Sequence, residues 1–270
     1  MPDSELGRPG LLEGRVGIVV GVGRGLGRDV ALAFANEGAA VVLAARSTEV
    51  MSEVADEVRA LGTRALTVKT DMHDPGHCQA LADAAVAEFG RIDSLVTVAY
   101  LTSDRTRLTE TSPDLANWRP QFETNFFATL QVARAVAPQM MTQRSGRIIF
   151  VNSMAVRLVA PRMGSYISSK AALEAAARVM AQELGPYGIR VNSLHPGYMW
   201  GERVRQIMQH RAAENGTTFD EEYAKVRDAL ALRYIPPTSE YAGTIVFLAS
   251  DLSLPVTGES IWANGGQTRH

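Results

Sequence analysis

Cysteine is almost absent from this chain of 270 residues, which contains only Cys78. A single cysteine cannot form a disulfide within the chain, so nothing in the sequence requires an oxidising compartment. Stability must therefore come from packing of the apolar residues, which make up 46% of the sequence and allow a sizeable core.

Long apolar runs are missing as well. The best candidate, residues 94–103, is bracketed by Asp93 and Asp104 and is too short to span a membrane. Residues 1–14 include Asp3, Glu5 and Glu13 and no continuous apolar stretch, unlike a secretory signal peptide. We therefore expect no membrane association and a cytoplasmic location.

An excess of positive charge is also lacking, because 27 lysines and arginines stand against 29 acidic residues, for a net charge of -2. This balance gives no reason to expect nucleic acid or anionic lipid as a partner. Only Lys69, Lys170 and Lys225 are lysines, so the position of each is informative.

What the sequence does contain is an alternation of short, continuous apolar runs with longer helical patterns. Continuous runs are typical of strands buried on both faces. We expect an α/β fold with a doubly wound parallel sheet of about seven strands and helices on both faces. The expected strands are residues 16–20, 40–44, 64–69, 94–98, 147–152, 190–194 and 260–262.

No repeat, low-complexity tract or linker marks a domain boundary. Residues 14–270 are therefore expected to form a single domain, after a flexible leader at 1–13. Residues 198–239 interrupt the alternation, since they are charged and contain two expected helices before Pro236 and Pro237. An excursion of this kind is expected to be a substrate lid.

Three local signals predict helix boundaries. The first helix should follow Gly25, bury Leu26, Val30, Ala33 and Phe34, and stop at Gly38. Asp74 as N-cap and Pro75 in the first turn predict the start of another helix. Ser112 and Pro113 predict a further helix in the same way.

The first expected strand runs into a helix through the sequence GVGRGLG, residues 21–27. Gly21, Gly25 and Gly27 have the spacing G-x-x-x-G-x-G, and a turn without side chains lets backbone N–H groups and the helix dipole approach a pyrophosphate. The alternative is that the glycines serve only the geometry of the turn.

Tyr166 and Lys170 lie four residues apart in an expected helix, which places both on one face. An ammonium near a phenol lowers the pKa of the phenol, so Lys170 could tune Tyr166 for proton transfer. Ser153 follows an expected strand, at the edge where ligands of parallel sheets bind, and could donate to a substrate oxygen. The alternative is a solvated lysine, a half-buried ring and a capping serine.

Together these residues resemble the short-chain dehydrogenase/reductase family in its single-domain, Rossmann-like form. The resemblance extends from Leu12 to Gly266 and includes Asn192, the residue pair 257–258 and residues 247–250. The residues that match the catalytic tetrad of the family are Asn125, Ser153, Tyr166 and Lys170. The residues expected at the cofactor are Gly21, Gly23, Arg24, Gly25, Leu26, Gly27, Ala45, Arg46, Asp71, Met72, Ala99, Tyr166, Lys170, Pro196 and Gly197.

The resemblance implies hydride exchange between a nicotinamide cofactor and a carbonyl or alcohol carbon. Tyr166 would move the proton and Ser153 would orient the substrate oxygen. Lys170 would hold the nicotinamide ribose and lower the pKa of Tyr166, and Asn125 would support a relay water. The resemblance also implies a homotetramer or homodimer.

NADP(H) is favoured over NAD(H), which stays possible. Relatives that prefer NAD end the second strand with an acid, whereas this chain has Ala45 and then Arg46. An arginine can bind a 2′-phosphate in a fork, and Arg24 offers a second positive charge. The alternative is that Arg46 belongs to a solvated loop.

The chain departs from the family pattern at four places around the cofactor. Val20 and Gly201 replace threonines, and residues 97–100 are TVAY where the family has NNAG. Tyr100 is the largest change, because a ring takes the place of a glycine. We expect altered binding or pocket shape with the chemistry retained.

A bulky hydrophobic ketone or secondary alcohol is the expected substrate, although each residue of the apolar wall could equally belong to the core. The expected wall consists of Tyr100, Met154, Met163, Tyr198, Met199 and Trp200. The alternative function is a catalytically silent nucleotide-binding regulator or scaffold. An epimerase or dehydratase would need an additional domain.

A metal site is not expected. His73, Asp74, His77 and Cys78 are close in sequence, but Pro75 and Gly76 between them indicate a helix start at the surface. His195 is assigned no role.

Overall fold

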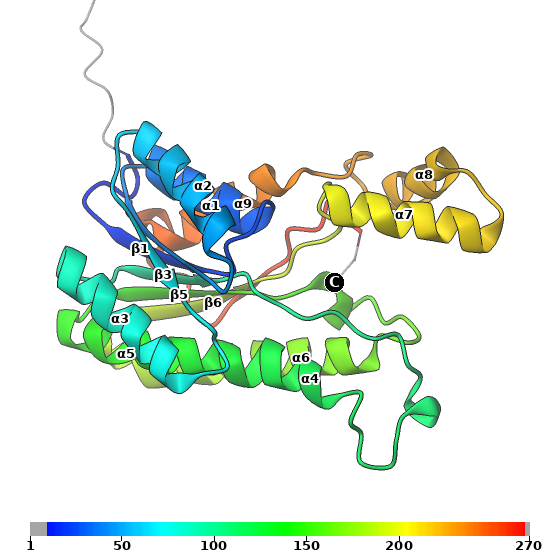
Figure 1. The fold of residues 1–270 in the computed structure, drawn as a ribbon, viewed down its shortest axis with the longest axis horizontal. Coiled ribbons are helices and arrows are strands. Elements are labelled where there is room, and N and C mark those ends of the chain that lie inside the picture. The colour runs from blue at the N-terminus through cyan, green and yellow to red at the C-terminus, as the bar shows by residue number, and fades with distance from the viewer. Residues whose placement is uncertain (1–9, 268–270) are drawn as a thin grey trace, which may run out of the picture.

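The computed structural model describes residues 10–267. Its centre is a seven-stranded sheet with the order β3-β2-β1-β4-β5-β6-β7, and every neighbouring pair is parallel (Figure 1). The strands are β1 (Val16–Val20), β2 (Ala40–Ala45), β3 (Ala65–Lys69), β4 (Ser94–Thr97), β5 (Gly146–Val151), β6 (Ile189–Leu194) and β7 (Ser260–Ile261). The predicted parallel sheet is confirmed, and no strand end differs from its predicted position by more than one residue.

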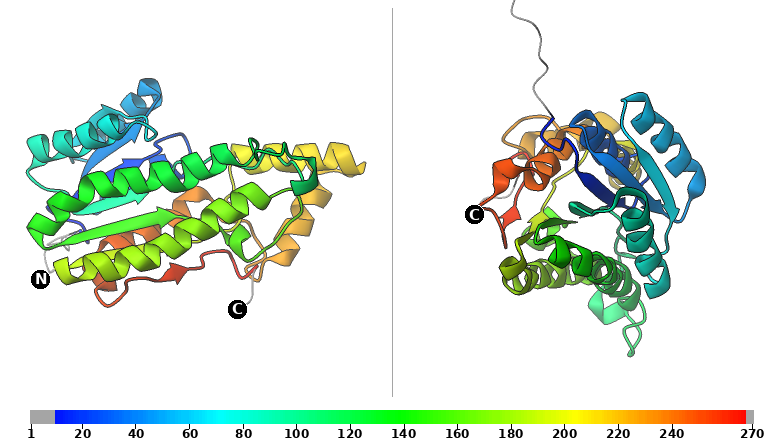
Figure 2. Two further views of the ribbon diagram at one scale, coloured as in Figure 1. Left: turned by 90° about the horizontal axis from the view of Figure 1, so that it is seen from below. Right: turned by 90° about the vertical axis from the view of Figure 1, so that its left-hand side faces the viewer.

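Helices cover both faces of the sheet (Figures 1 and 2). One face carries α1 (Leu26–Asn36), α2 (Thr48–Ala60) and α9 (Thr238–Ala249). The other carries α3 (Pro75–Phe89), α5 (Thr129–Gln143) and α6 (Gly164–Leu184), with α4 (Arg119–Phe122) joined to α5 by the π-helical segment η2 (Glu123–Ala128). Short 3-10 turns are η1 (Leu108–Glu110), η3 (Met154–Val156), η4 (Gly185–Tyr187) and η5 (Asp251–Ser253).

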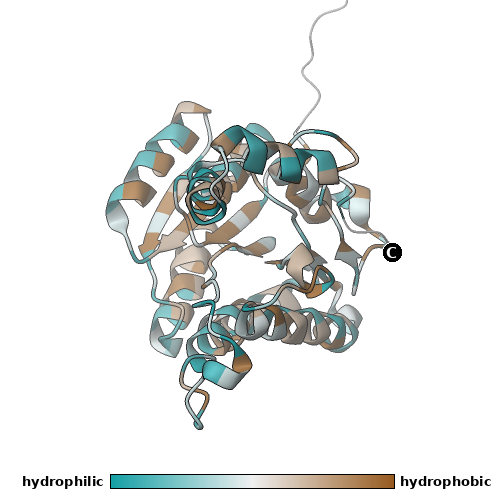
Figure 3. Ribbon diagram, turned by 90° about the vertical axis from the view of Figure 1, so that its right-hand side faces the viewer, coloured by the Kyte–Doolittle hydropathy of each residue, from teal (hydrophilic) through white to brown (hydrophobic). Residues whose placement is uncertain are grey.

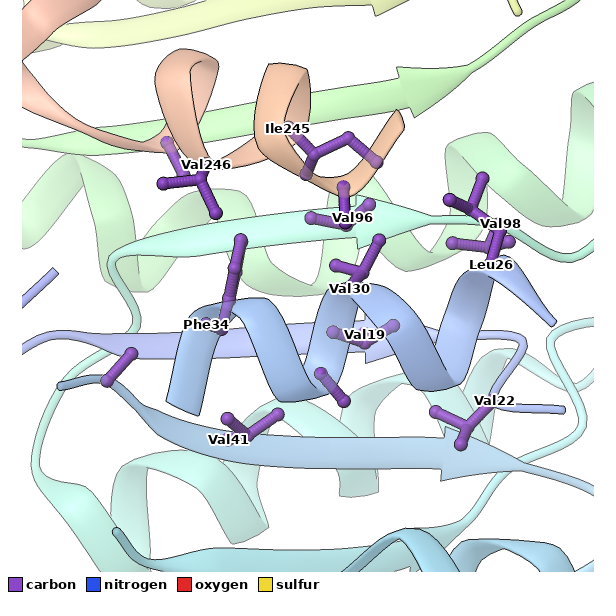
Figure 4. Close-up of a cluster of buried hydrophobic side chains, with 14 of the residues drawn as sticks. Val19, Val22, Leu26, Val30, Phe34, Val41, Val96, Val98, Ile245 and Val246 are labelled. Atoms are coloured by element: carbon purple, nitrogen blue, oxygen red, sulfur yellow. The ribbon is translucent and has the colours of Figure 1, made fainter. Parts of the chain in front are cut away.

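Alternation along the strands divides the apolar side chains between two cores. Val19 and Val41 belong to the first core, beneath α1 and α9, whereas Ile18 and Val42 belong to the second. Figure 4 shows Val19, Val41 and Val96 pointing toward α1 and α9. Both faces of the central strands are therefore buried, which explains why their sequences are continuously apolar.

The packing of α1 against β1 depends on a missing side chain. A Cβ at Gly17 would lie 2.4 Å from the Phe34 ring, which is 0% exposed. Only glycine at this position lets the ring approach the strand.

Two of the three predicted helix boundaries are confirmed. α1 ends next to Gly38, whose φ is 85°, and the Asp74 carboxylate accepts from the backbone N–H groups of Gly76 and His77 at the start of α3. The helix predicted at Ser112 and Pro113 is wrong. Leu115 takes a φ of 56°, which no helix tolerates, so residues 112–118 form turns and α4 begins at Arg119.

The expected leader lies mostly outside the described residues, which begin at Gly10. Residues 10–13 are packed onto the domain, because Leu12 is 1% exposed and its N–H donates to the carbonyl of Glu37 at 2.9 Å. Leu12 therefore belongs to the first core, and Leu11 packs against it.

Residues 198–239 contain α7 (Glu202–Asn215) and α8 (Phe219–Ala229), the two helices predicted there. They extend beyond the sheet at the right of Figure 1 and enclose a small core of their own, which includes Val204, Met208 and Val226. Trp200 packs edge-on against Tyr223 in this core. In the end-on view of Figure 3 hydrophobic colour concentrates in the sheet, while α7 is mostly hydrophilic.

Within residues 10–267, no helix combines the length and the apolar character needed to cross a membrane.

Phe34→Ala tests the packing of α1 on the sheet. Loss of this buried ring should lower the free energy of unfolding by about 3–5 kcal/mol, because the lost transfer free energy and the remaining cavity both destabilise the fold. The measurement is urea denaturation followed by circular dichroism. Leu252→Ala, at a side chain that is 59% exposed, is the control and should change the value by less than about 1 kcal/mol. A similar loss in both variants would contradict this account of the core.

Candidate active site

A cavity of about 610 Å³ opens where β1, β4, β5 and β6 end and α7 begins. Parallel strands place their carboxyl ends at one edge, so loops distant in the sequence meet there. The predicted residues that line the cavity are Gly21, Gly23, Arg24, Gly25, Leu26, Gly27, Ala99, Ser153, Tyr166, Lys170, Pro196 and Gly197. The predicted residues outside its lining are Ala45, Arg46, Asp71, Met72 and Asn125.

The glycines of the first turn have two different functions. A Cβ at Gly21 would lie 2.4 Å from the Ala99 nitrogen, and one at Gly27 would lie 2.5 Å from the Gly21 carbonyl oxygen. These two glycines let the turn pack tightly. A Cβ at Gly23 or Gly25 would meet nothing within 4 Å, and both residues line the cavity. Their bare backbone at the start of α1 is a cradle that fits a pyrophosphate.

A second feature also fits a polar ligand. Asn152 lines the cavity, and neither its buried Nδ2 nor its buried Oδ1 atom has a partner among the described residues. Buried polar atoms are normally hydrogen-bonded, so an amide in this state indicates a place where a ligand binds.

Backbone bonds compensate for the missing threonine at Val20. The carbonyl of Val20 accepts from the N–H groups of Val98 (2.7 Å) and Ala99 (3.2 Å), and the N–H of Gly21 donates to Ala44 (2.8 Å). The turn is thus held to β2 and to the end of β4 without a side-chain hydroxyl.

Tyr166 and Lys170 lie one turn apart on α6, and both line the cavity. The Lys170 Nζ donates to the carbonyl of Val151 at 2.9 Å, and the side chain is almost fully buried. Burial without a carboxylate partner lowers the pKa of Lys170 to about 7.

The expected lowering of the Tyr166 pKa by Lys170 is not found in the protein by itself. Burial raises the pKa of Tyr166 to about 12, and this effect outweighs a hydrogen bond with Ser153 and the positive charge of Arg203, both of which lower it. Burial of the phenol is the main cause, and Lys170, whose own pKa is lowered by burial, does not offset it.

Ser153 is held by its surroundings on both sides. Its Oγ accepts from the N–H of Ala155 at 3.1 Å, and its carbonyl lies 3.0 Å from the His195 Nδ1. Burial lowers the pKa of His195 to about 4, so the ring is neutral and donates through Nδ1. His195 is 0% exposed and stacks on Trp262. Sequence reasoning gave His195 no role, and only its place before Pro196 could have indicated one.

Asn125 lies in the π-helical segment η2, and its side chain faces the protein. Its Oδ1 accepts from the Leu101 N–H at 2.7 Å, and its Nδ2 donates to the Leu101 carbonyl at 2.9 Å and to the Ser169 Oγ at 3.0 Å. The amide ties the chain after β4 to α6. Support of a relay water stays a prediction.

Ala45 is the last residue of β2 and Arg46 follows it, while Asp71 and Met72 lie just after β3. Arg46 is exposed, and its charge helps to hold the pKa of the Asp71 carboxyl below its usual range, after hydrogen bonds from His73. Arg24 is also exposed but pairs with Glu53 at 2.9 Å. Of the two arginines, only Arg24 therefore has its guanidinium in an ion pair among the described residues.

The expected apolar wall is found in part. Tyr100, Tyr198 and Met199 line the cavity, whereas Met154, Met163 and Trp200 do not. Trp200 packs in the α7–α8 core instead, because the chain turns outward before α7. Lining residues that sequence reasoning missed are Val98, Val151, Asn152, Glu202, Arg203, Val204, Ile207 and Thr238. Glu202 and Arg203 could have been predicted as lining residues only from their place in the sequence, shortly after Gly197.

No set of three or more metal-ligating side chains comes together in the described part of the chain. Cys78 is buried in α3, its thiol contacts the Met72 carbonyl, and burial raises its pKa to about 11. The two ring nitrogens of His73 are hydrogen-bonded to the side chains of Asp71 and Thr124.

Comparison with known proteins identifies relatives along nearly the whole chain. Residues 21–268 match the profile of a family described as Enoyl-(Acyl carrier protein) reductase. A short chain dehydrogenase/reductase of Aspergillus oryzae, astE, is 34% identical over 257 residues, which cover 94% of this chain and 95% of the relative.

Two solved structures are similar in fold and in sequence. NAD+-bound xylitol dehydrogenase has a TM-score of 0.87 and 28% identity, over 94% of this chain and 99% of that one. L-sorbose reductase from Gluconobacter frateurii, complexed with NADPH and L-sorbose, has a TM-score of 0.89 and 26% identity, over 97% and 99% of the two chains.

Lys170→Met tests whether the buried amine is discharged. The pKa of Lys170 falls from 10.5 to about 7 on folding, so between these values the unfolded chain binds a proton that the folded chain lacks. The free energy of unfolding of the wild type, relative to the variant, should then rise with pH from about 7 to 10, by up to about 1.4 kcal/mol per pH unit.

Urea denaturation of both proteins at each pH measures this difference, and other titrating groups cancel in it. Lys69→Met, at an exposed lysine of β3, is the control and should show a flat difference. A flat difference for Lys170→Met as well would mean that the folded protein keeps Lys170 protonated.

Proposed function

We propose a specific reaction for this chain, which belongs to the short-chain dehydrogenase/reductase family: hydride exchange between NADP(H) and a hydrophobic ketone or secondary alcohol. Membership makes the chain an oxidoreductase that acts on CH–OH or C=O groups with a nicotinamide cofactor. The phosphorylated cofactor and the hydrophobic substrate are the proposal.

The observation that carries the reaction is the meeting of Ser153, Tyr166 and Lys170 on the wall of one cavity. In our proposal the Tyr166 hydroxyl passes a proton to or from the substrate oxygen, and the Ser153 hydroxyl donates to that oxygen as charge develops. The nicotinamide, when bound, supplies or accepts the hydride.

Lys170 completes the proton site in this proposal. Its position one turn after Tyr166 lets a charged ammonium favour the phenolate, as the Arg203 guanidinium already does. By resemblance to the family, the Lys170 amine would also hold the nicotinamide ribose, and the backbone at Gly23 and Gly25 would hold the pyrophosphate. An enzyme is favoured over a silent nucleotide-binding regulator because these reactive side chains are all present.

NADP(H) is proposed because Ala45 leaves no acid at the end of β2 and Arg46 is exposed beside it. Arg24 can contribute once it separates from Glu53. NAD(H) is the alternative, since xylitol dehydrogenase was solved with NAD+ and L-sorbose reductase with NADPH.

Residues 198–239 are proposed to act as the substrate lid. The α7–α8 unit has its own core and rejoins the domain where the Trp200 N–H donates to the Pro236 carbonyl at 2.7 Å. Both ends of the segment therefore lie together, as a hinged unit requires. Val204 and Ile207 of α7 line the cavity and support a hydrophobic substrate.

A homodimer or homotetramer is proposed through the faces of α5 and α6. Between these helices lies an apolar groove in which Phe127 is 47% and Val179 is 56% exposed. Apolar faces of this kind are typical of interfaces between copies of a chain. The cytoplasmic location and the absence of a nucleic-acid partner stay predictions from the sequence.

Tyr166→Phe tests the proton-transfer role. Turnover of a ketone panel with NADPH should fall about 100-fold to 10,000-fold, because the variant has no transferable proton. The rate is followed at the nicotinamide absorbance, and cofactor binding, measured by fluorescence, should stay close to that of the wild type. Tyr187→Phe, in η4 away from the cavity, is the control. Retained turnover in Tyr166→Phe would refute the role, and a wild type that binds cofactor without any turnover would favour the regulator.

Arg46→Ala tests the cofactor. The wild type should use NADPH better than NADH, and the variant should lose about 10-fold to 100-fold of kcat/KM for NADPH while changing little with NADH. Arg59→Ala, an exposed arginine near the end of α2, serves as the control. Faster wild-type rates with NADH would overturn the proposal.

A further inference from the structure

Arg203 is a charged residue of α7 that lines the cavity and lies near Tyr166, the proposed reactive phenol. It lies in the first turn of α7, and its Cζ is 5.0 Å from the centroid of the Tyr100 ring. The same ring lies edge-on to Tyr166, at 6.3 Å between centroids, and 6.0 Å from the Lys170 Nζ. The guanidinium therefore reaches the cavity beside the reactive phenol.

The neighbouring polar side chains of the proposed lid interact with other residues, whereas Arg203 forms no ion pair with a described carboxylate. The carboxylate of Glu202 accepts from Gln206, and Arg211 donates to the Tyr198 hydroxyl at 3.0 Å. Arg205 lies over the Trp200 ring, away from the cavity. Among residues 10–267 no carboxylate lies within ion-pair distance of Arg203. Its five N–H donors are left for a ligand.

The charges of the cavity favour an anionic ligand at this position. Arg24 has Glu53 as its partner, and Lys170 has the Val151 carbonyl. Glu202 is the single carboxylate among the described residues that line the cavity, and it is already hydrogen-bonded. An arginine presents a rigid fork that matches a carboxylate, and this pairing is strongest where water is partly excluded.

Arg203 is itself exposed, and the apolar character of the cavity comes from other residues. Met199, Val204 and Ile207 line the cavity on the lid side. Resting on the proposed function, we infer that the substrate is a hydrophobic ketone or secondary alcohol that bears one carboxylate, and that Arg203 binds this carboxylate while Tyr166 and Ser153 meet the reacting oxygen. Arg203 is then a specificity-determining residue.

The test uses the full chain and NADPH with matched pairs of probes. The acids are 4-oxo-4-phenylbutanoate and 5-oxo-5-phenylpentanoate, and each is compared with its methyl ester. For whichever of the two keto acids is the better substrate, the kcat/KM of the wild type should be about 10-fold to 100-fold higher than for its methyl ester, as expected for a charge-assisted pair. In Arg203→Gln this preference should fall toward 1, and in the matched control Arg205→Gln it should remain.

Direct binding gives a second readout that does not need turnover. Calorimetry with the NADP+-loaded protein should show tighter binding of the acid than of the ester, and this difference should disappear in Arg203→Gln. The dissociation constant of NADPH, measured by fluorescence, should be the same in the wild type and in Arg203→Gln.

Three results would overturn the inference. An ester that binds and reacts as well as its acid excludes a carboxylate subsite. A weaker binding of NADPH in Arg203→Gln, with acid and ester affected equally, assigns the guanidinium to a cofactor phosphate. Reduction of neutral ketones with neither binding nor turnover of the acids refutes the inference and leaves the proposed function standing. The proposed oxidoreductase reaction fails if no ketone is reduced and no secondary alcohol is oxidised with either cofactor, whereas faster rates with NADH overturn only the choice of NADP(H).

Discussion

Everything at the site depends on one constraint, namely that seven parallel strands, the central ones buried on both faces, carry their carboxyl ends at the same edge of the sheet. Side chains fill both faces, so a ligand can enter only where the strands stop. The glycine turn after β1, Tyr100 after β4 and Ser153 after β5 are distant in sequence, yet this edge brings them onto one cavity. The helices supply the rest, since α6 runs past the edge and presents Tyr166 and Lys170 to it.

Burial also decides the electrostatics of this edge. Tyr166 and Lys170 are held among apolar side chains, and burial disfavours the charged form of each, so the pKa of the phenol rises and that of the amine falls. A proton is thus kept on the phenol in the protein alone. A ligand that favours the ammonium form of Lys170 makes Tyr166 more acidic as well, which would couple proton transfer to ligand binding.

The strands and most site residues could be predicted because they depend on local patterns. Continuous apolar runs identified the sheet, and Asp74 and Gly38 marked real helix ends. The expected helix after Ser112 failed because a left-handed residue, Leu115, follows, and leucine gives no signal for that conformation. The direction of the Tyr166 pKa shift could not be read from spacing, because a four-residue separation says nothing about how deeply both groups are buried.

The segment that contains α7 and α8 shows a second limit of prediction from the sequence. Trp200 looked like a wall of the cavity but packs into the α7–α8 core, while the polar Glu202 and Arg203 that follow it face the cavity. Tyr100, where relatives are expected to have a glycine, stands between Lys170, Tyr166 and Arg203. A small residue at position 100 would leave the Arg203 guanidinium without an aromatic surface to lie on. The departure at Tyr100 and the Arg203 cation at the start of α7 are therefore linked by one contact.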